Sequence, residues 1–152
     1  MPYTTAEGRQ QLLDALAEAI AEIGAALSSL GEAYELLDER KADELERTLF
    51  GPVQVAYGRA RRTHSEFARR HGLPEHAFAP ATPGAPSHGA RGFVDEAVEA
   101  ATRADATLAT LQDSMLPVEV GDADLRAGLG EVRSQLDGLR DHARELLRTL
   151  GR

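Results

Sequence analysis

Apolar side chains recur along most of this 152-residue chain at steps of three and four residues. That spacing gathers them on one face of an α-helix, whereas a half-buried strand would alternate every second residue. Four segments show the pattern, and turn residues or prolines separate them. The sequence therefore predicts four amphipathic helices, over residues 5–38, 42–72, 89–115 and 122–150.

The first predicted helix opens with Thr4 and Glu7, which have the spacing of a capping box. Ser29 and Glu32 repeat that spacing, so a break near Ser28 is the alternative. The apolar stripe continues across that point, which favours one long helix. The stripe consists of Leu12, Leu16, Ile20, Ile23, Leu27, Leu30, Tyr34 and Leu37.

The second predicted helix contains Gly51 and Pro52 in its interior. Proline donates no backbone hydrogen bond and crowds the carbonyl four residues earlier. We therefore expect this helix to be kinked at Gly51-Pro52, with a complete break there as the alternative. Gly72 and Pro74 mark its end. Its stripe consists of Leu45, Leu49, Val53, Ala56, Ala60, His64, Phe67 and His71.

Residues 73–88 hold four prolines and have no helical period, so they are predicted to form the one long loop of the chain. We interpret the loop as a connector that crosses the end of the molecule and that Phe78 could anchor. A lid or binding loop is the alternative. After the third helix, either Asp122 or Asp124 is a suitable N-cap for the fourth.

Four helices of similar length, with short turns between the first and second and between the third and fourth, favour an all-α fold. We predict one domain, an antiparallel four-helix bundle with up-down-up-down order. A bundle in which two chains exchange adjacent helices is the alternative.

The composition narrows the possible functions. The chain has no cysteine, which excludes disulfides, thiolate metal sites and thiol nucleophiles. Charged residues interrupt every apolar segment, so no membrane span is predicted, and we see no signal peptide. The net charge of −8 argues against nucleic acid as a partner. We expect a cytoplasmic protein.

The charge is unevenly spread, because residues 39–72 carry eight basic and five acidic side chains in an acidic protein. Ion pairing with acidic neighbouring helices is one interpretation of this excess. The other is a patch for an anion or an acidic partner, formed by Arg59, Arg62, Arg69 and Arg70.

A metal site within the bundle would need histidines and carboxylates in one layer. His64 is expected at about the height of Glu18 and His142, with Glu145 one turn beyond His142. However, the chain has no Glu-x-x-His, which the di-iron bundles require. A packed histidine with one paired ring nitrogen is therefore the simpler interpretation of His64.

No phosphate-binding loop and no nucleophile elbow is present, so we predict no catalytic residue and no cofactor. The leading hypothesis is a non-enzymatic protein that associates with a second copy, as a homo-dimer, or with another protein. The second is an internal metal or small-ligand site near His64. Six apolar residues beside the stripes could widen the core or form an interface: Leu13, Leu36, Phe50, Tyr57, Val98 and Leu147.

Overall fold

The computed structural model describes residues 4–82 and 89–150. Within these ranges every regular element is helical and no strand occurs, so the predicted all-helical class is confirmed. No helix in them is long and apolar enough to span a membrane. The described ranges contain five longer helices, whereas four were predicted: α1 (Thr5–Glu35), α3 (Gly51–Arg70), α4 (Gly89–Asp113), α6 (Ala123–Leu136) and α7 (Leu139–Leu150). The shorter elements are α2 (Glu39–Leu45), the π-helical turn η1 (Glu46–Phe50) and α5 (Leu116–Glu119).

Helix α1 begins at the predicted capping box, where the Thr4 hydroxyl accepts a hydrogen bond from the backbone N–H of Glu7 at 3.1 Å. It passes the candidate break near Ser28 without interruption. It ends three residues earlier than predicted. The reason is that Asp38 caps α2 instead, accepting from the backbone N–H of Lys41 at 2.9 Å.

The second predicted helix continues through Gly51 and Pro52, because α2, η1 and α3 follow one another without a gap. The chain accommodates the proline by a π turn directly before it, in which the Gly51 N–H bonds to the Glu46 carbonyl. A regular α-helical turn would press the proline ring against the carbonyl four residues earlier. The expected distortion is therefore a local widening of the helix, and the alternative of a break is not observed.

Residues with positive φ follow the ends of α3 and α4. Gly72 has a φ of +66°, the left-handed conformation expected of the cap after α3. The Leu73 N–H then donates to the Ala68 carbonyl at 2.8 Å, which satisfies one of the last carbonyls of the helix. Helix α4 was predicted to reach Met115 but ends two residues earlier, at Asp113. Met115 itself has a φ of +69°.

The last predicted helix, over residues 122–150, is interrupted, which corrects the prediction. Asp137 is extended and Gly138 has a φ of +79°, so α6 and α7 are separate helices. Leu136 and Leu139 are buried on either side of the interruption. The apolar spacing therefore continues across it, and only the turn-forming dipeptide Asp-Gly signals the break.

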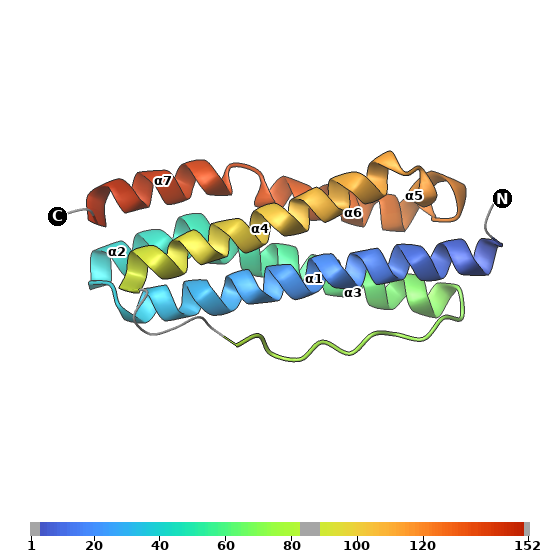
Figure 1. The fold of residues 1–152 in the computed structure, drawn as a ribbon, viewed down its shortest axis with the longest axis horizontal. Helices are drawn as coiled ribbons and strands as arrows, with labels where there is room; N and C mark the ends of the chain where they lie inside the picture. The colour runs from blue at the N-terminus through green and yellow to red at the C-terminus, as the bar shows by residue number, and fades with distance from the viewer. Residues whose placement is uncertain (1–3, 83–88, 151–152) are drawn as a thin grey trace.

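Helix α1 runs antiparallel to both α3 and α4 (Figure 1). A short turn joins α1 to α2, so α2 and α3 return along α1. Arg103 of α4 pairs with Glu22 of α1 at 2.6 Å. Nearer the start of α1, Arg9 donates to the carbonyl of Val120, which lies beyond the end of α4, at 3.0 Å. The consecutive helices α3 and α4 consequently point in the same direction, and the predicted up-down-up-down order is not observed.

The segment after α3 has to return along the whole molecule rather than cross its end. Its described part, residues 73–82, lies extended along α1 and α3 (Figure 1). Sixteen residues of a proline-rich chain reach about 50 Å at roughly 3.1 Å per residue, whereas the 31 residues of α1 span about 46 Å. The prolines thus make a full-length return possible. The remaining loop residues, 83–88, lie outside the described residues.

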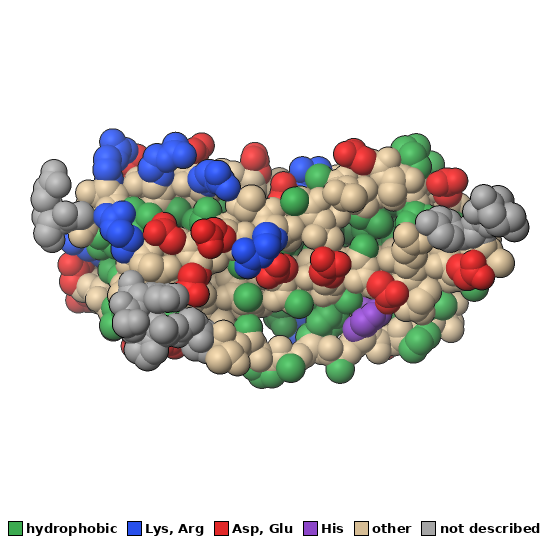
Figure 2. Space-filling model, in the orientation of Figure 1, with side chains coloured by type: hydrophobic (Ala, Val, Ile, Leu, Met, Phe, Trp, Pro, Cys, Tyr) green, Lys and Arg blue, Asp and Glu red, His purple; other side chains and the backbone are tan. Residues whose placement is uncertain are grey.

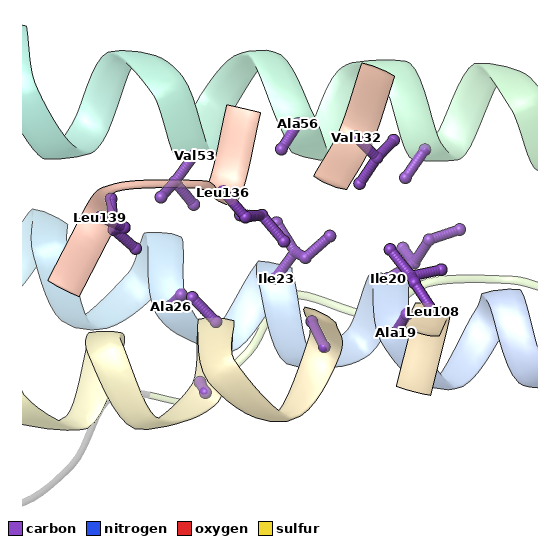
Figure 3. Close-up of a cluster of buried hydrophobic side chains, with 14 of the residues drawn as sticks. Ala19, Ile20, Ile23, Ala26, Val53, Ala56, Leu108, Val132, Leu136 and Leu139 are labelled. Carbon is purple, nitrogen blue, oxygen red and sulfur yellow. The ribbon is translucent and has the colours of Figure 1, made fainter. Parts of the chain in front are cut away.

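The core is a continuous apolar cluster between the helices, and its middle is shown in Figure 3. Most of the predicted stripe positions are buried there, and His64 is among them, with 1% of its surface exposed. Tyr34, near the end of α1, is 36% exposed although it belongs to the predicted stripe. The side chains labelled in the figure come from all five longer helices: Ala19, Ile20, Ile23, Ala26, Val53, Ala56, Leu108, Val132, Leu136 and Leu139.

Candidate functional site

Residues 73–82, here called the strap, are fastened to two helices by polar contacts. The Ser65 hydroxyl of α3 donates to a Glu75 carboxylate oxygen at 2.6 Å. The Ser28 hydroxyl of α1 donates to the Ala81 carbonyl at 3.3 Å. Between these points the strap stands partly clear of the helices, and Figure 2 shows an open gap beside it.

A chain of three side chains joins the strap to the interior. His64 Nε2 of α3 lies 2.9 Å from His76 Nδ1 of the strap, and His76 Nε2 lies 3.0 Å from Asp14 Oδ1 of α1. The Phe78 ring packs edge to face with the His64 ring, with their centroids 5.3 Å apart. The buried histidine of the predicted stripe is therefore bonded to a residue of the loop.

The hydrogen bonds define the protonation of this chain. The Asp14 carboxylate only accepts, so His76 Nε2 carries a proton and donates to it. In a neutral His76, Nδ1 is then an acceptor, and His64 Nε2 is the donor. Burial, and to a smaller extent His76, lower the pKa of His64 to about 4, against the opposing effects of Glu75 and Asp14. His64 is thus uncharged near neutral pH.

A hollow of about 390 Å³ lies between α3 and the strap, and we call it the arginine hollow. Three guanidinium groups line it, and the only carboxylate among its described lining residues, that of Glu75, is already bonded to Ser65. Its lining consists of Tyr57, Gly58, Arg61, Arg62, His64, Ser65, Arg69, Glu75, His76 and Phe78.

None of the three arginines of the hollow has a carboxylate within ion-pair distance among the described residues. The Arg61 guanidinium lies over the rings of Tyr57 and Phe78, at 5.5 and 5.6 Å from their centroids. Arg69 donates to the neutral Ser65 hydroxyl at 2.9 Å. Arg62 is exposed. The described lining of the hollow therefore combines three guanidinium groups with the single carboxylate of Glu75, so positive charge is in excess there.

The predicted arginine patch divides into two groups. Arg62 and Arg69 line the hollow, together with Arg61. Arg59 instead pairs with Glu131 of α6, and Arg70 forms two hydrogen bonds with the Asp122 carboxylate, at 2.8 and 2.9 Å. The neutralising acids lie on α6, not on the acidic first helix.

Asp122 is the N-cap of α6 and also holds the end of α3. Burial alone would raise the pKa of its carboxyl group. Hydrogen bonds from Arg70, the Leu125 backbone and His71 outweigh that effect and hold the pKa well below its usual range. Asp122 therefore stays ionised and connects α3 firmly to α6.

The four candidate metal ligands are not gathered in one layer. Because α3 and α6 are antiparallel, Thr63, the neighbour of His64, packs against Gly128. His142 lies 14 residues further along the chain, which corresponds to about 20 Å of helix. Glu18 and Glu145 are exposed. The described ranges contain no group of three or more His, Cys, Asp or Glu side chains that could hold a metal ion.

Sequence reasoning missed Asp14, Glu75 and His76 as parts of the site. Helical period places residues on a face, but it cannot place a side chain of an extended loop. The signal that was present is the sequence Glu75-His76-Ala77-Phe78, with polar and aromatic side chains in an otherwise Pro- and Ala-rich segment.

The chain Asp14–His76–His64 resembles a proton relay, but it does not end at a nucleophile. His64 is 1% exposed, and in the described ranges no hydroxyl group is bonded to either histidine. General base catalysis requires a base within hydrogen-bond reach of the proton it removes. The arrangement is thus suited to holding charge and a proton rather than to activating a nucleophile.

A second, larger groove of about 730 Å³ lies between α4 and α7 and contains Arg91, Arg140, Arg144 and Arg148. Figure 2 shows basic side chains gathered at that end of the molecule. Each of these arginines donates to an oxygen of the protein itself: the Leu147 carbonyl, the Thr102 hydroxyl, Asp141 and Glu145, in the same order. Two of the four arginines of the groove thus pair with a carboxylate, and the other two donate to neutral oxygens.

Searches of family models, curated proteins and solved structures find no match to the chain.

Proposed function

We propose that the protein is a non-enzymatic binding protein that holds a small oxyanion, such as a carboxylate or phosphate group, in the arginine hollow. The supporting observation is that Arg61, Arg62 and Arg69 face one hollow without a carboxylate partner among the described residues. Guanidinium groups bind planar or tetrahedral oxyanions through several charge-assisted hydrogen bonds. The scaffold we propose is a four-helix bundle in which α2–α3 and α6–α7 each form one interrupted helix.

Association with a second copy or another protein, the leading hypothesis from sequence, has less support. A stable apolar interface needs a contiguous patch of several hundred Å². In the described ranges the large exposed apolar side chains are dispersed over separate elements: Tyr34 and Leu36 at the end of α1, Val55 on α3, Met115 directly before α5 and Val118 within it. Of the other candidates, Leu13 is fully buried and Phe50, Tyr57, Val98 and Leu147 are partly buried against the core.

The test is a titration of the whole protein with sulfate and with benzoate, followed by amide chemical shifts. We expect shifts centred on Gly58 and Ser65, which line the hollow. The variant Arg62→Gln with Arg69→Gln should bind at least about tenfold more weakly, because each lost charge-assisted bond contributes about 1.5–3 kcal/mol.

The matched control is Arg144→Gln with Arg148→Gln, which removes the same charge from the α4–α7 groove. It should bind the anions within about twofold of the wild type, because the variant leaves the hollow intact. Equal weakening by the two variants would mean that only net charge matters and would reject the proposed site. Stronger binding of benzoate than of sulfate would identify a carboxylate with an apolar body as the ligand.

A further inference from the structure

The pair His64–His76 is the only hydrogen-bonded histidine pair in the described ranges, and it borders the arginine hollow. In the neutral pair, each ring nitrogen that faces a neighbouring side chain forms a hydrogen bond: His64 donates to His76, and His76 donates to Asp14. The pair is thus a site where a proton can be stored next to a candidate anion site.

One proton can enter the pair without breaking the chain. His76 then becomes an imidazolium that donates from Nε2 to Asp14 and from Nδ1 to His64, while His64 accepts with its proton on Nδ1. A second proton would place two N–H groups against each other across 2.9 Å and would break the contact. The geometry therefore accommodates one added proton.

The charges around the pair decide whether that proton is bound. From α1 the Asp14 carboxylate faces His76, and from the strap Glu75 lies close, and both favour the cation. From α3 the guanidiniums of Arg61, Arg62 and Arg69 line the same hollow and disfavour it. Two acids that contact α3, Glu131 of α6 and its N-cap Asp122, are already paired with Arg59 and Arg70. An anion in the hollow would offset the three guanidiniums and shift the balance toward the protonated pair.

We propose that an oxyanion binds in the arginine hollow together with one proton, which the His64–His76 pair takes up. The site then takes up an anion and one proton together, so its affinity for the anion rises as the pH falls. This inference rests on the proposed function, because it requires an anion in the hollow. Linkage gives its size: uptake of one full proton changes the affinity tenfold per pH unit, and partial uptake changes it less.

The experiment is calorimetric titration of the full chain with sulfate, which does not itself titrate near neutral pH, in two cationic buffers of different ionisation enthalpy. The difference between the buffers gives the number of protons taken up. We expect close to one proton per sulfate near pH 6.5 and at least about tenfold tighter binding at about pH 5.5 than at about pH 7.5.

The variant His76→Gln should bind sulfate without proton uptake, so its affinity should not rise between about pH 7.5 and pH 5.5. Asp14→Asn gives a second test, because its exposed side chain can be changed with little risk to folding, and it should reduce the uptake. His142→Gln, at an exposed site on α7, should leave the uptake unchanged.

Binding without proton uptake by the wild type, or unchanged uptake in His76→Gln, would overturn the coupling alone. Absence of sulfate binding at every pH would overturn the proposed function as well.

Discussion

The arginine hollow and the α4–α7 groove contain similar numbers of arginines but differ in how these are satisfied. In the groove Arg144 and Arg148 pair with carboxylates, whereas Arg91 and Arg140 donate to neutral oxygens. In the hollow Arg61 is covered by aromatic rings and Arg69 by a neutral hydroxyl. The number of arginines in a region therefore does not mark an anion site by itself, whereas the lack of a carboxylate paired with any of them in the described ranges supports the proposed one.

The difference arises from the position of the acids. On α7 the acids Asp141 and Glu145 precede Arg144 and Arg148 by three residues, so the helix neutralises itself. On α3 the acids of the neighbouring α6 reach only two arginines, Arg59 and Arg70. The strap covers the stretch between them with Glu75, His76 and Phe78, and the Glu75 carboxylate is bonded to Ser65 rather than to an arginine.

The largest expected effect concerns His64, the floor of the hollow. Its pKa is lowered from 6.5 to about 4 in the folded protein, so the unfolded chain takes up the proton first as the pH falls. The contribution to stability is complete above about pH 6.5 and is lost between about pH 6.5 and pH 4, and it amounts to about 3 kcal/mol. Urea unfolding at a series of pH values measures this loss.

His64→Gln keeps a polar side chain at the position and lacks the titration. The free energy of unfolding of this variant should therefore fall less steeply than that of the wild type between about pH 6.5 and pH 4. His142→Gln, whose ring is exposed, should follow the wild-type curve. Parallel curves for the wild type and His64→Gln would contradict the burial of an uncharged histidine beneath the strap.

The sequence predicted the helical class and most of the buried positions, because both follow from apolar spacing. It placed His64 in a core stripe, and the side chain is buried there. Thr4 has the capping contact that its spacing predicted, and Gly72 has the left-handed conformation expected of it. These features depend on neighbours within one or two turns of the same helix, so local sequence contains the information.

The directions of the helices could not be predicted in the same way. The loop over residues 73–88 was expected to cross one end of the molecule, but it returns along its length, and this reverses α4 and α6 relative to the expectation. His64 therefore lies near the level of Gly128 instead of His142. Contacts between the strap and the helices depend on that reversal, which is why Asp14 and His76 were missed.

The second prediction concerns the contact between α3 and α6 next to His64. A Cβ atom at Gly128 would lie 2.2 Å from Thr63 Oγ1, and Thr63 is buried beside His64. Gly128→Ala should therefore force α3 and α6 apart and lower the free energy of unfolding by about 2 kcal/mol, as overpacking does. Chemical denaturation measures the change.

Gly130 is the matched control, because it lies in the same helix and a Cβ atom there would meet nothing within 4 Å. Gly130→Ala should raise the free energy of unfolding by about 0.5–1 kcal/mol through helix propensity alone. Adding Thr63→Ala to Gly128→Ala should recover part of the loss. A stabilising Gly128→Ala would contradict the close contact between α3 and α6 at Thr63.

The smallest effect tests the comparison of the two regions directly, since both substitutions exchange an exposed helical arginine for alanine. Arg144→Ala removes an ion pair with Asp141 and should lower the free energy of unfolding by a few tenths of a kcal/mol relative to Arg62→Ala. Arg62→Ala removes one of three neighbouring like charges in the hollow, so repulsion decreases. Helix propensity contributes the same amount to both variants and cancels in their difference.

That difference should be largest at low ionic strength and should shrink when about 0.5 M salt screens both interactions. If the two variants had equal stability at low salt, the charges of the hollow would be as well compensated as those of the groove, and the electrostatic basis for an anion site would be lost.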